Sequence, residues 1–190
     1  MFEVELKYPL SDVAATTASL ERLSARFRPA IEQTDRYFAH PSRDFARVDE
    51  ALRLRRDGAT VVVTWKGPRL GAGAKTRREI ELPVEIAAGQ GAAVTLERWT
   101  ELLEALGFRA VREVVKTRRP ARLPWQGAEV EVAIDTVAHL GDFLELELMA
   151  GEGQLPVALS CLASVAAELG CGEPERRSYL EMLLAVDRPR

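Results

Sequence analysis

Apolar and charged residues alternate along the first segment of the chain. Residues 2–9 read Phe-Glu-Val-Glu-Leu-Lys-Tyr-Pro, and this period of two predicts a strand with Glu3, Glu5 and Lys7 on one face. Further strands are predicted over residues 31–39, 51–56, 60–66, 77–83, 108–118, 128–137 and 143–149. The pair Asp57-Gly58 predicts a tight hairpin turn between two of these strands. A turn at residues 140–142 is predicted just before the last one.

Helical spacing of apolar residues predicts four helices between groups of strands. The first runs from Val13 to Arg28 with Ser11 as its N-cap, and the second covers residues 94–106 and ends before Gly107. A third covers residues 155–169, and a short final one covers 176–186. Residues 67–75, rich in glycine, predict a mobile loop. Antiparallel strands with helices inserted between them indicate the α+β class, built on an antiparallel sheet or barrel.

Seven of the predicted strands carry charged or polar residues at alternate positions. For a single half-buried strand, such residues are usually a solvated outer face. The repetition of the pattern in seven strands weakens that interpretation. If the sheet closes into a barrel, one face of every strand points inward and the other outward. The rows are Glu3/Glu5/Lys7, Arg53/Arg55, Thr64/Lys66, Arg77/Glu79/Glu81, Lys116/Arg118, Glu129/Glu131 and Glu145/Glu147.

The apolar residues between these charges then point out of the barrel. They need helices packed on the outside, and the predicted helices can supply that cover. The alternating apolar set is Val4, Leu6, Leu52, Leu54, Val63, Trp65, Ile80, Leu82, Leu144, Leu146 and Leu148. A charged interior is costly to bury unless it binds something. We therefore expect a highly charged ligand inside the barrel.

Composition limits the remaining function classes. The 190 residues carry 26 Lys and Arg against 29 Asp and Glu, which gives a formal net charge of −3, and a chain of this size and composition is typical of one globular domain. No apolar run approaches the length of a membrane span and the first residues do not resemble a signal peptide, so we expect a cytoplasmic protein without membrane contact. The small net charge argues against a broad nucleic-acid-binding surface. Cys161 and Cys171 have no partners at zinc-ligand spacing.

The types of charge indicate the kind of ligand. Clustered Arg and Lys favour phosphate oxygens, whereas paired carboxylates on neighbouring strands favour a hard divalent cation such as Mg²⁺. The segment Gly71-Ala-Gly-Ala-Lys75 is not a Walker sequence and does not lead into a helix. Phosphate binding is therefore expected from side chains that line a tunnel.

The ordered succession of strand motifs resembles the CYTH, or triphosphate tunnel metalloenzyme, superfamily, and within it most resembles class IV adenylyl cyclase homologues. The resemblance covers residues 1–190 as a single domain and begins with Glu3-x-Glu5-x-Lys7. It implies an eight-stranded antiparallel β-barrel tunnel, with helices packed on the outside, that binds a triphosphate with Mg²⁺ or Mn²⁺. The other matching motifs are Asp35-x-Tyr37-Phe38, Leu52-Arg53-Leu54-Arg55, Thr64-Trp65-Lys66-Gly67-Pro68, Arg77-x-Glu79-x-Glu81, Lys116-x-Arg118, Asp135, Gly141-Asp142-Phe143-Leu144-Glu145-Leu146-Glu147 and Ser178-Tyr179.

The resemblance assigns site residues by position. The metal-binding carboxylates that it implies are Glu3, Glu5, Glu145 and Glu147. The triphosphate-binding residues that it implies are Lys7, Arg53, Arg55, Lys66, Arg77, Lys116 and Arg118. Among all of these, Glu3, Glu5, Lys7 and Arg118 are expected to be catalytic, together with Asp135, which resembles a position near the metal or the nucleotide.

Other polar residues leave alternatives open. Glu79 and Glu81 can bind a second metal, orient basic neighbours or balance the charge of the tunnel. Tyr37 lies on the same face of its predicted strand as Asp35 and can face the tunnel or pack elsewhere. Ser178-Tyr179 is expected to close or brace a tunnel mouth. His40 and His139 lie in or beside predicted loops without matching partners, so an incidental role is expected for both.

Two reactions and one binding role fit the resemblance. A class IV adenylyl cyclase converts ATP to cyclic AMP and pyrophosphate, whereas a triphosphatase of the group hydrolyses thiamine triphosphate or inorganic triphosphate. A non-catalytic polyphosphate- or nucleotide-binding module would keep the basic residues and lose the metal carboxylates. Because the four glutamates are present, an enzyme is expected, with the cyclase ahead of the triphosphatase. The partners implied are a nucleoside triphosphate or another triphosphate substrate and, since family members often dimerise, a second copy of the chain.

Overall fold

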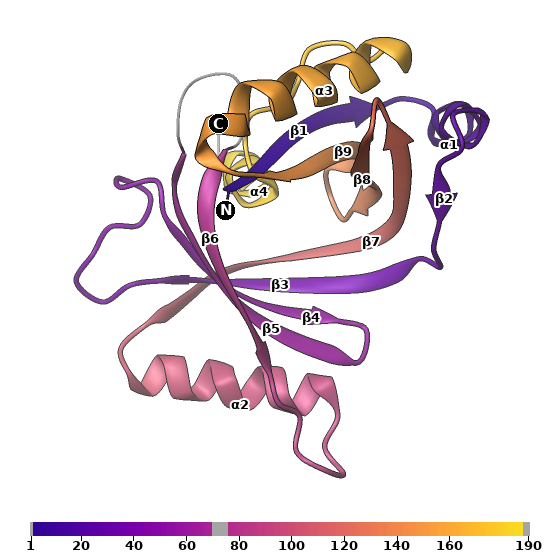
Figure 1. The fold of residues 1–190 in the computed structure, drawn as a ribbon. Helices are drawn as coiled ribbons and strands as arrows, with labels where there is room; N and C mark the ends of the chain where they lie inside the picture. The colour runs from indigo at the N-terminus through magenta and orange to yellow at the C-terminus, as the bar shows by residue number, and fades with distance from the viewer. Residues whose placement is uncertain (1, 70–75, 188–190) are drawn as a thin grey trace.

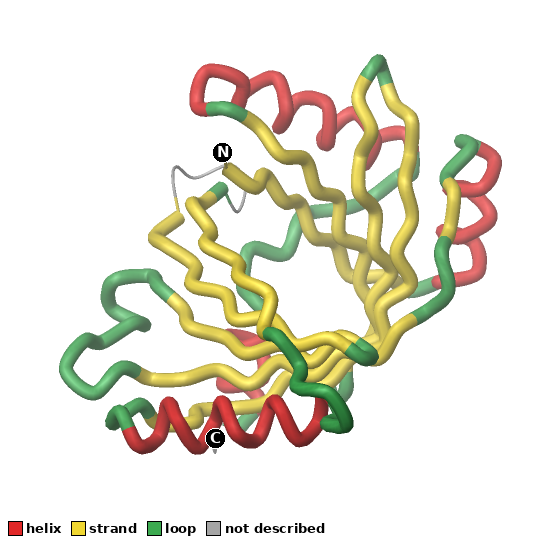
Figure 2. The backbone as a smooth tube through the Cα atoms, turned by 60° about the horizontal axis from the view of Figure 1, so that its bottom comes forward, coloured by secondary structure: helices red, strands yellow, loops and turns green. Residues whose placement is uncertain are grey.

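A computed structural model describes residues 2–69 and 76–187 of the chain. Its strands form one antiparallel sheet in the order β2-β7-β3-β4-β5-β6-β1-β9-β8, and β8 pairs back onto β7, which closes eight of the strands into a barrel with β2 outside the ring. Figure 2 shows this ring of strands. The strands are β1 (Phe2–Leu10), β2 (Arg26–Phe27), β3 (Ile31–Ala39), β4 (Ala51–Asp57), β5 (Thr60–Arg69), β6 (Arg77–Val84), β7 (Arg109–Trp125), β8 (Ala128–Val137) and β9 (Gly141–Ala150).

The first and last strands of the barrel, β1 and β9, are neighbours in its wall. All nine residues of β1 have a partner on β9, and the register sets Glu5 opposite Glu147 and Lys7 opposite Glu145. On its other side β1 pairs with β6, where Glu3 lies opposite Arg77. The alternation seen in the sequence therefore places acidic residues of the first and last barrel strands on one inner wall.

Four α-helices surround the ring in the described residues (Figure 1), and residues of the last one also line the interior cavity. They are α1 (Val13–Arg22), α2 (Ala92–Ala105), α3 (Leu155–Glu168) and α4 (Tyr179–Val186), and a short 3₁₀ turn, Glu152–Gln154, precedes α3. Helix α3 packs on β1 and β9, whereas α2 packs on β4, β5 and β7. Both cover apolar side chains of the outer barrel face, such as Leu146 under α3 and Leu54 under α2. None of the described helices combines the length and apolar character needed to cross a membrane.

The expected helical cover buries only part of the outward apolar set. Val4, Leu6 and Leu144 are buried, as predicted. On β6, however, Ile80 keeps 42% and Leu82 57% of its surface exposed. The outward side of β6 is therefore the part of the predicted apolar face that the described helices leave open.

Several element ends differ from the sequence prediction. Helix α1 is capped by the side chain of Asp12, not Ser11, and ends at Arg22, because Ser24 adopts a positive φ of 70° that a helix cannot continue through. The final helix starts at Tyr179, since Ser178 and Glu181 form a reciprocal capping box at its N-terminus.

Strand β7 runs on to Trp125, well beyond the predicted end at Arg118, because it pairs continuously with β8 through Pro120 and Pro124. The predicted loop over residues 67–75 begins later than expected, since β5 continues to Arg69. The rest of that loop, residues 70–75, lies outside the described residues.

Candidate functional site

A cavity of about 910 Å³ occupies the barrel interior and is lined by inward side chains of seven strands, by the β3–β4 loop (residues 40–50) and by α4. A second cavity of about 660 Å³ shares Arg55, Arg118 and Glu147 with the first, so the interior is reached from two sides that meet at these residues. Eleven of the twelve residues that the sequence assigns to the site line the larger cavity. They are Glu3, Glu5, Lys7, Arg53, Arg55, Lys66, Arg77, Lys116, Arg118, Glu145 and Glu147.

Carboxylates gather on the wall formed by β1 and β9. Burial raises the pKa of Glu147, and the negative charge of Glu3 adds to the rise. Burial likewise raises the pKa of Glu3, against the opposing effect of Lys66. Such mutual repulsion would be relieved by a cation, and hard oxygen donors are the ligands that Mg²⁺ and Mn²⁺ prefer.

The carboxylates do not by themselves form a complete metal cage. Over residues 2–69 and 76–187, no three Asp, Glu, His or Cys side chains converge in a geometry that could hold an ion. Mg²⁺ is typically bound by one or two carboxylates and completes its shell with substrate phosphates and water. The donor chemistry of this wall therefore fits a divalent ion that arrives together with a phosphate ligand.

Arg118 links the acidic wall to the basic one. Its guanidinium forms a short contact with Glu145, and its Nη1 lies 3.8 Å from Glu147. The same side chain donates to both carboxylate oxygens of Asp135, at 2.8 and 2.7 Å. Burial opposes the charge on Arg118, but Glu145 and Asp135 outweigh it and raise the pKa of the guanidinium. Arg118 is thus held in place by the carboxylates of two strands.

Asp135 lies behind the cavity wall and is fully buried. Lys116 donates to its Oδ2 at 2.6 Å, and the hydroxyl of Tyr179 donates to the same oxygen at 3.2 Å. The structure therefore places Asp135, predicted near the metal or the nucleotide, where it orients three residues that do line the cavity. This is the geometry of a positioning residue.

A second buried carboxylate, Asp35, orients the basic row of β4. It accepts from Arg55 Nε at 2.6 Å and from Arg53 Nη1 at 3.4 Å, and only 2% of the residue is exposed. Burial alone would raise the pKa of Asp35, but Arg53 and Arg55 hold it well below its usual range. The sequence analysis placed Asp35 in a motif but gave it no role. The feature that could have identified it is its position on the inward face of β3, the strand that pairs with β4.

This ion pair gives the fold an acid-sensitive element. Because the pKa of Asp35 is lower in the folded chain than the ordinary value of about 4, the pair stabilises the fold above that pH, and its contribution is lost as the pH falls further. We expect Asp35→Asn to lower the free energy of unfolding by about 2 kcal/mol at pH 7 and the deficit to shrink at pH 3. Urea titrations at both pH values measure this. Asp187→Asn, which removes an exposed partner of Arg112, should change little, and a deficit of Asp35→Asn that is the same at both pH values would contradict the assignment.

Glu79 and Glu81 on β6 contact basic residues of β5 and β4. Lys66 Nζ lies 2.5 Å from Glu79, and Arg53 Nη2 lies 3.9 Å from Glu81. Thr64 also donates to Glu81, at 3.2 Å. Of the roles that the sequence left open for these two glutamates, this geometry supports the orientation of basic neighbours.

Lys7 is almost completely buried, and residues near the C-terminus hold its side chain in position. Its Nζ donates to the backbone oxygen of Arg177 at 2.6 Å and lies 4.0 Å from the centre of the Tyr179 ring. The Tyr179 ring also lies 5.1 Å from Lys116 Nζ. Ser178-Tyr179, expected to brace a tunnel mouth, thus contacts both buried lysines of the site.

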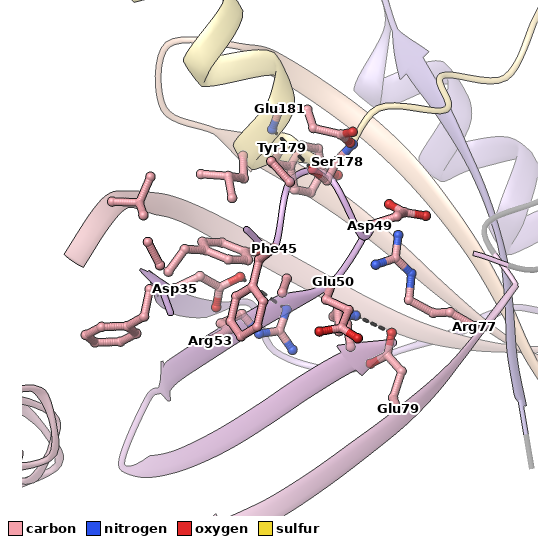
Figure 3. Close-up of a pocket in the computed structure, with 18 of the residues that line it drawn as sticks. Asp35, Phe45, Asp49, Glu50, Arg53, Arg77, Glu79, Ser178, Tyr179 and Glu181 are labelled. Carbon is pink, nitrogen blue, oxygen red and sulfur yellow. Dashed lines mark hydrogen bonds and ion pairs between the residues drawn. The ribbon is translucent and has the colours of Figure 1, made fainter. Parts of the chain in front are cut away.

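Residues that the sequence analysis did not assign close one side of the cavity. Arg69, at the end of β5, donates to Asp49 from its backbone and side chain, at 2.9 and 3.0 Å. It also donates to Glu181 of α4 at 3.0 Å. Arg69 therefore joins the β3–β4 loop to the last helix, and Figure 3 shows Asp49 and Glu181 around this opening. No periodic signal marks these residues, because two of them lie at the end of a strand and in a loop.

Comparisons with known proteins agree with this architecture. A family model described as the CYTH domain matches residues 1–179. The adenylate cyclase CyaB of Aeromonas hydrophila is 32% identical over 184 residues, which are 94% of this chain and 86% of that protein. The structure of the PH1819 protein of Pyrococcus horikoshii OT3 matches with a TM-score of 0.83 at 36% identity and covers 97% of this chain and 99% of that one. A candidate adenylyl cyclase of Hippeastrum, described as having a dominant triphosphatase activity, shares the fold with a TM-score of 0.62 at 17% identity and covers 99% of this chain and 97% of that one.

Proposed function

The chain belongs to the CYTH domain family, and from this premise we propose that it is a divalent-metal-dependent enzyme that converts ATP to cyclic AMP and pyrophosphate. The observation that carries the proposal is the cavity itself. Basic side chains from β1, β4, β5, β6 and β7 face one space, and the carboxylates of β1 and β9 line the same space. The relative named as an adenylate cyclase supports this reaction over others.

The basic residues provide the binding surface for the triphosphate. Arg53, Arg55, Lys66, Arg77, Lys116, Arg118 and Lys7 would contact its phosphate oxygens. The Nε of Arg53 is buried and finds no acceptor among residues 2–69 and 76–187. A buried donor of this kind is stabilised by an acceptor on a bound ligand, which an anionic phosphate would supply.

Glu3, Glu5, Glu145 and Glu147 would hold Mg²⁺ or Mn²⁺ together with phosphate oxygens. When bound, such an ion neutralises phosphate charge and lowers the pKa of an oxygen nucleophile. Binding would compete with the contact between Arg118 and Glu145, since both partners of that pair face the cavity. Arg118 would then be available to the phosphates.

In the cyclase reaction the ribose 3′-oxygen forms a bond to the α-phosphorus and loses its proton, while the bond from that phosphorus to the bridging oxygen of the β-phosphate breaks. Negative charge develops on the leaving pyrophosphate. The fixed guanidinium groups of Arg53 and Arg55 would stabilise this charge without reorganising, because Asp35 already holds them in place.

Hydrolysis of a triphosphate is the second candidate function, and the Hippeastrum protein is the observation that favours it. The same basic side chains would stabilise a leaving phosphate group when water attacks the terminal phosphorus. The two reactions differ in which phosphorus is attacked, so their products distinguish them.

The test is incubation of the purified chain with ATP, tripolyphosphate or thiamine triphosphate, each with Mg²⁺ or Mn²⁺, followed by identification of the products. Cyclic AMP together with pyrophosphate supports the proposed cyclase. Orthophosphate as the product supports the triphosphatase instead. If no substrate is converted but the triphosphates bind, the chain is a binding module and the enzymatic proposal fails.

A further inference from the structure

The cavity extends beyond the arginine row of β4, toward the β3–β4 loop. Ala51, Arg53 and Arg55 alternate on β4 and all line the cavity, as does Glu50 just before the strand. Arg55 lies five residue steps along the chain from Glu50, which corresponds to about 17 Å of extended backbone. A triphosphate bound along the arginine row therefore leaves room for a further group at the end formed by the β3–β4 loop.

The β3–β4 loop is held in a fixed conformation at this end. The backbone N–H of Glu50 donates to the carbonyl of Phe45 at 2.8 Å, so these two residues keep a constant spacing. The ring of His40 lies 5.0 Å from that of Phe108 and 5.5 Å from that of Phe45. At the other end of the loop, Asp49 is bonded to Arg69. The loop thus provides a preorganised wall rather than a segment that must order on binding.

Phe45 provides a planar apolar surface on this wall. Its ring packs on His40 but remains only half-buried, and it lines the cavity (Figure 3). Val111, Leu180 and Leu184 extend the apolar lining around the same cavity. An aromatic face in such surroundings is suited to stacking a planar ring.

Glu50 provides a hydrogen-bond acceptor beside that surface. Its side chain is only 3% exposed, and one carboxylate oxygen accepts from Arg43 in a short contact. The other oxygen, Oε2, is buried and has no donor within the part of the chain that the structure describes. A buried carboxylate oxygen without a donor is costly, whereas a ligand N–H or O–H would satisfy it.

We propose that Phe45 and Glu50 form a base-binding subsite, in which the base of a nucleoside triphosphate stacks on Phe45 and donates an N–H to Glu50 Oε2. The inference rests on the proposed function, since it takes the triphosphate to lie on the basic residues. An adenine offers its exocyclic amine as the donor. A hypoxanthine presents a carbonyl oxygen at that position and is disfavoured by the carboxylate.

Binding is tested by calorimetry in Mg²⁺ with analogues that carry methylene groups in place of both bridging phosphoanhydride oxygens, which neither reaction can cleave. The probes are the analogues of ATP, of inosine triphosphate, of 2′,3′-dideoxy-ATP and of inorganic triphosphate. We expect Phe45→Ala and Glu50→Gln each to weaken binding of the ATP analogue by about 10-fold or more. The affinity for the inorganic analogue should stay unchanged.

Glu50→Gln should also change the specificity for the base. Arg43 only donates, so the glutamine oxygen would pair with it and the amide N–H₂ would face the cavity. The preference for the ATP analogue over the inosine analogue should therefore fall or reverse. Glu32→Gln, which changes an exposed glutamate on β3, is the matched control and should bind all four probes as the parent does. Thermal melting of each variant, with Phe45→Leu as a milder substitution, separates a loss of binding from a loss of folding.

The outcomes separate the two proposals. If the parent chain does not bind the inorganic analogue, the triphosphate site of the proposed function fails, and the subsite fails with it. If the parent binds the inorganic analogue but Phe45→Ala and Glu50→Gln bind the ATP analogue as tightly as the parent, the triphosphate site stands and the base-binding subsite is overturned. A third outcome concerns the ribose. If the parent binds the dideoxy analogue more weakly than the ATP analogue, and Glu50→Gln binds the two equally, Glu50 contacts a ribose hydroxyl and its contact with the base is overturned.

Discussion

Replacing Glu5 with glutamine is expected to lower the metal-dependent turnover of the triphosphate substrate by about 100-fold or more, because several kcal/mol of transition-state stabilisation depend on the bound ion. Glu5 lies directly opposite Glu147 on the acidic wall of the cavity. The substitution keeps the shape of the side chain and removes one charged donor. Initial rates at increasing Mg²⁺ measure the effect, and the Mg²⁺ concentration for half-maximal activity should rise.

Glu32→Gln is the matched control for this prediction, since Glu32 is an exposed glutamate at a strand position outside the cavity. Its rate and its Mg²⁺ dependence should stay within about 2-fold of the parent, as is usual for substitutions away from such sites. The melting temperatures of both variants should match that of the parent. Full activity in Glu5→Gln would show that the β1–β9 wall is not the metal site.

The largest effect on stability is expected from Asp135→Ala. Asp135 is fully buried and is the shared partner of Lys116, Arg118 and Tyr179. Removing it leaves Lys116, itself 4% exposed, as a buried charge without this carboxylate. Breaking a buried pair in this way costs about 3–5 kcal/mol, and the free energy of unfolding measured in urea should fall by that amount.

Two further variants separate the charge effect from a simple loss of packing. Glu129→Gln removes one of the two carboxylate partners of Arg122, in an ion pair whose side chains are each about half exposed, and it should cost less than about 1 kcal/mol. The double variant Asp135→Leu with Lys116→Met should be more stable than the two single variants predict by addition, because it removes both charges together. Strict additivity would show that the pair between Asp135 and Lys116 is not the source of the loss.

The charged inner rows of the barrel were predictable because they depend on a local rule. Alternate residues of a strand face the same side, so Glu3, Glu5 and Lys7 had to share a face once β1 was a strand. The same rule placed Arg53 and Arg55 together. The resemblance to the CYTH superfamily then supplied the closure of the sheet, which alternation in single strands does not determine.

The groups that position these rows were harder to predict, because they depend on which strands become neighbours. Asp35 contacts Arg55 only because β3 pairs with β4 in this register. Tyr179 reaches Asp135 because α4 packs against the barrel. Glu50 and Phe45 lie in a loop without any period, so neither alternation nor helical spacing could mark them as part of the cavity wall. The roles of these residues thus depend on tertiary contacts, which the local sequence pattern does not specify.

The strand pairing that builds the acidic wall also determines when the site can form. Residue 5 meets residue 147 across β1 and β9, so the carboxylates of the first strand acquire their partners only after the rest of the barrel has been synthesised. Contacts between such distant parts of a chain slow folding, because a large loop must close before they form. During translation, the emerging first strand must therefore wait with its β9-facing edge unpaired, and the wall that we propose as the metal site forms late in the folding of the chain.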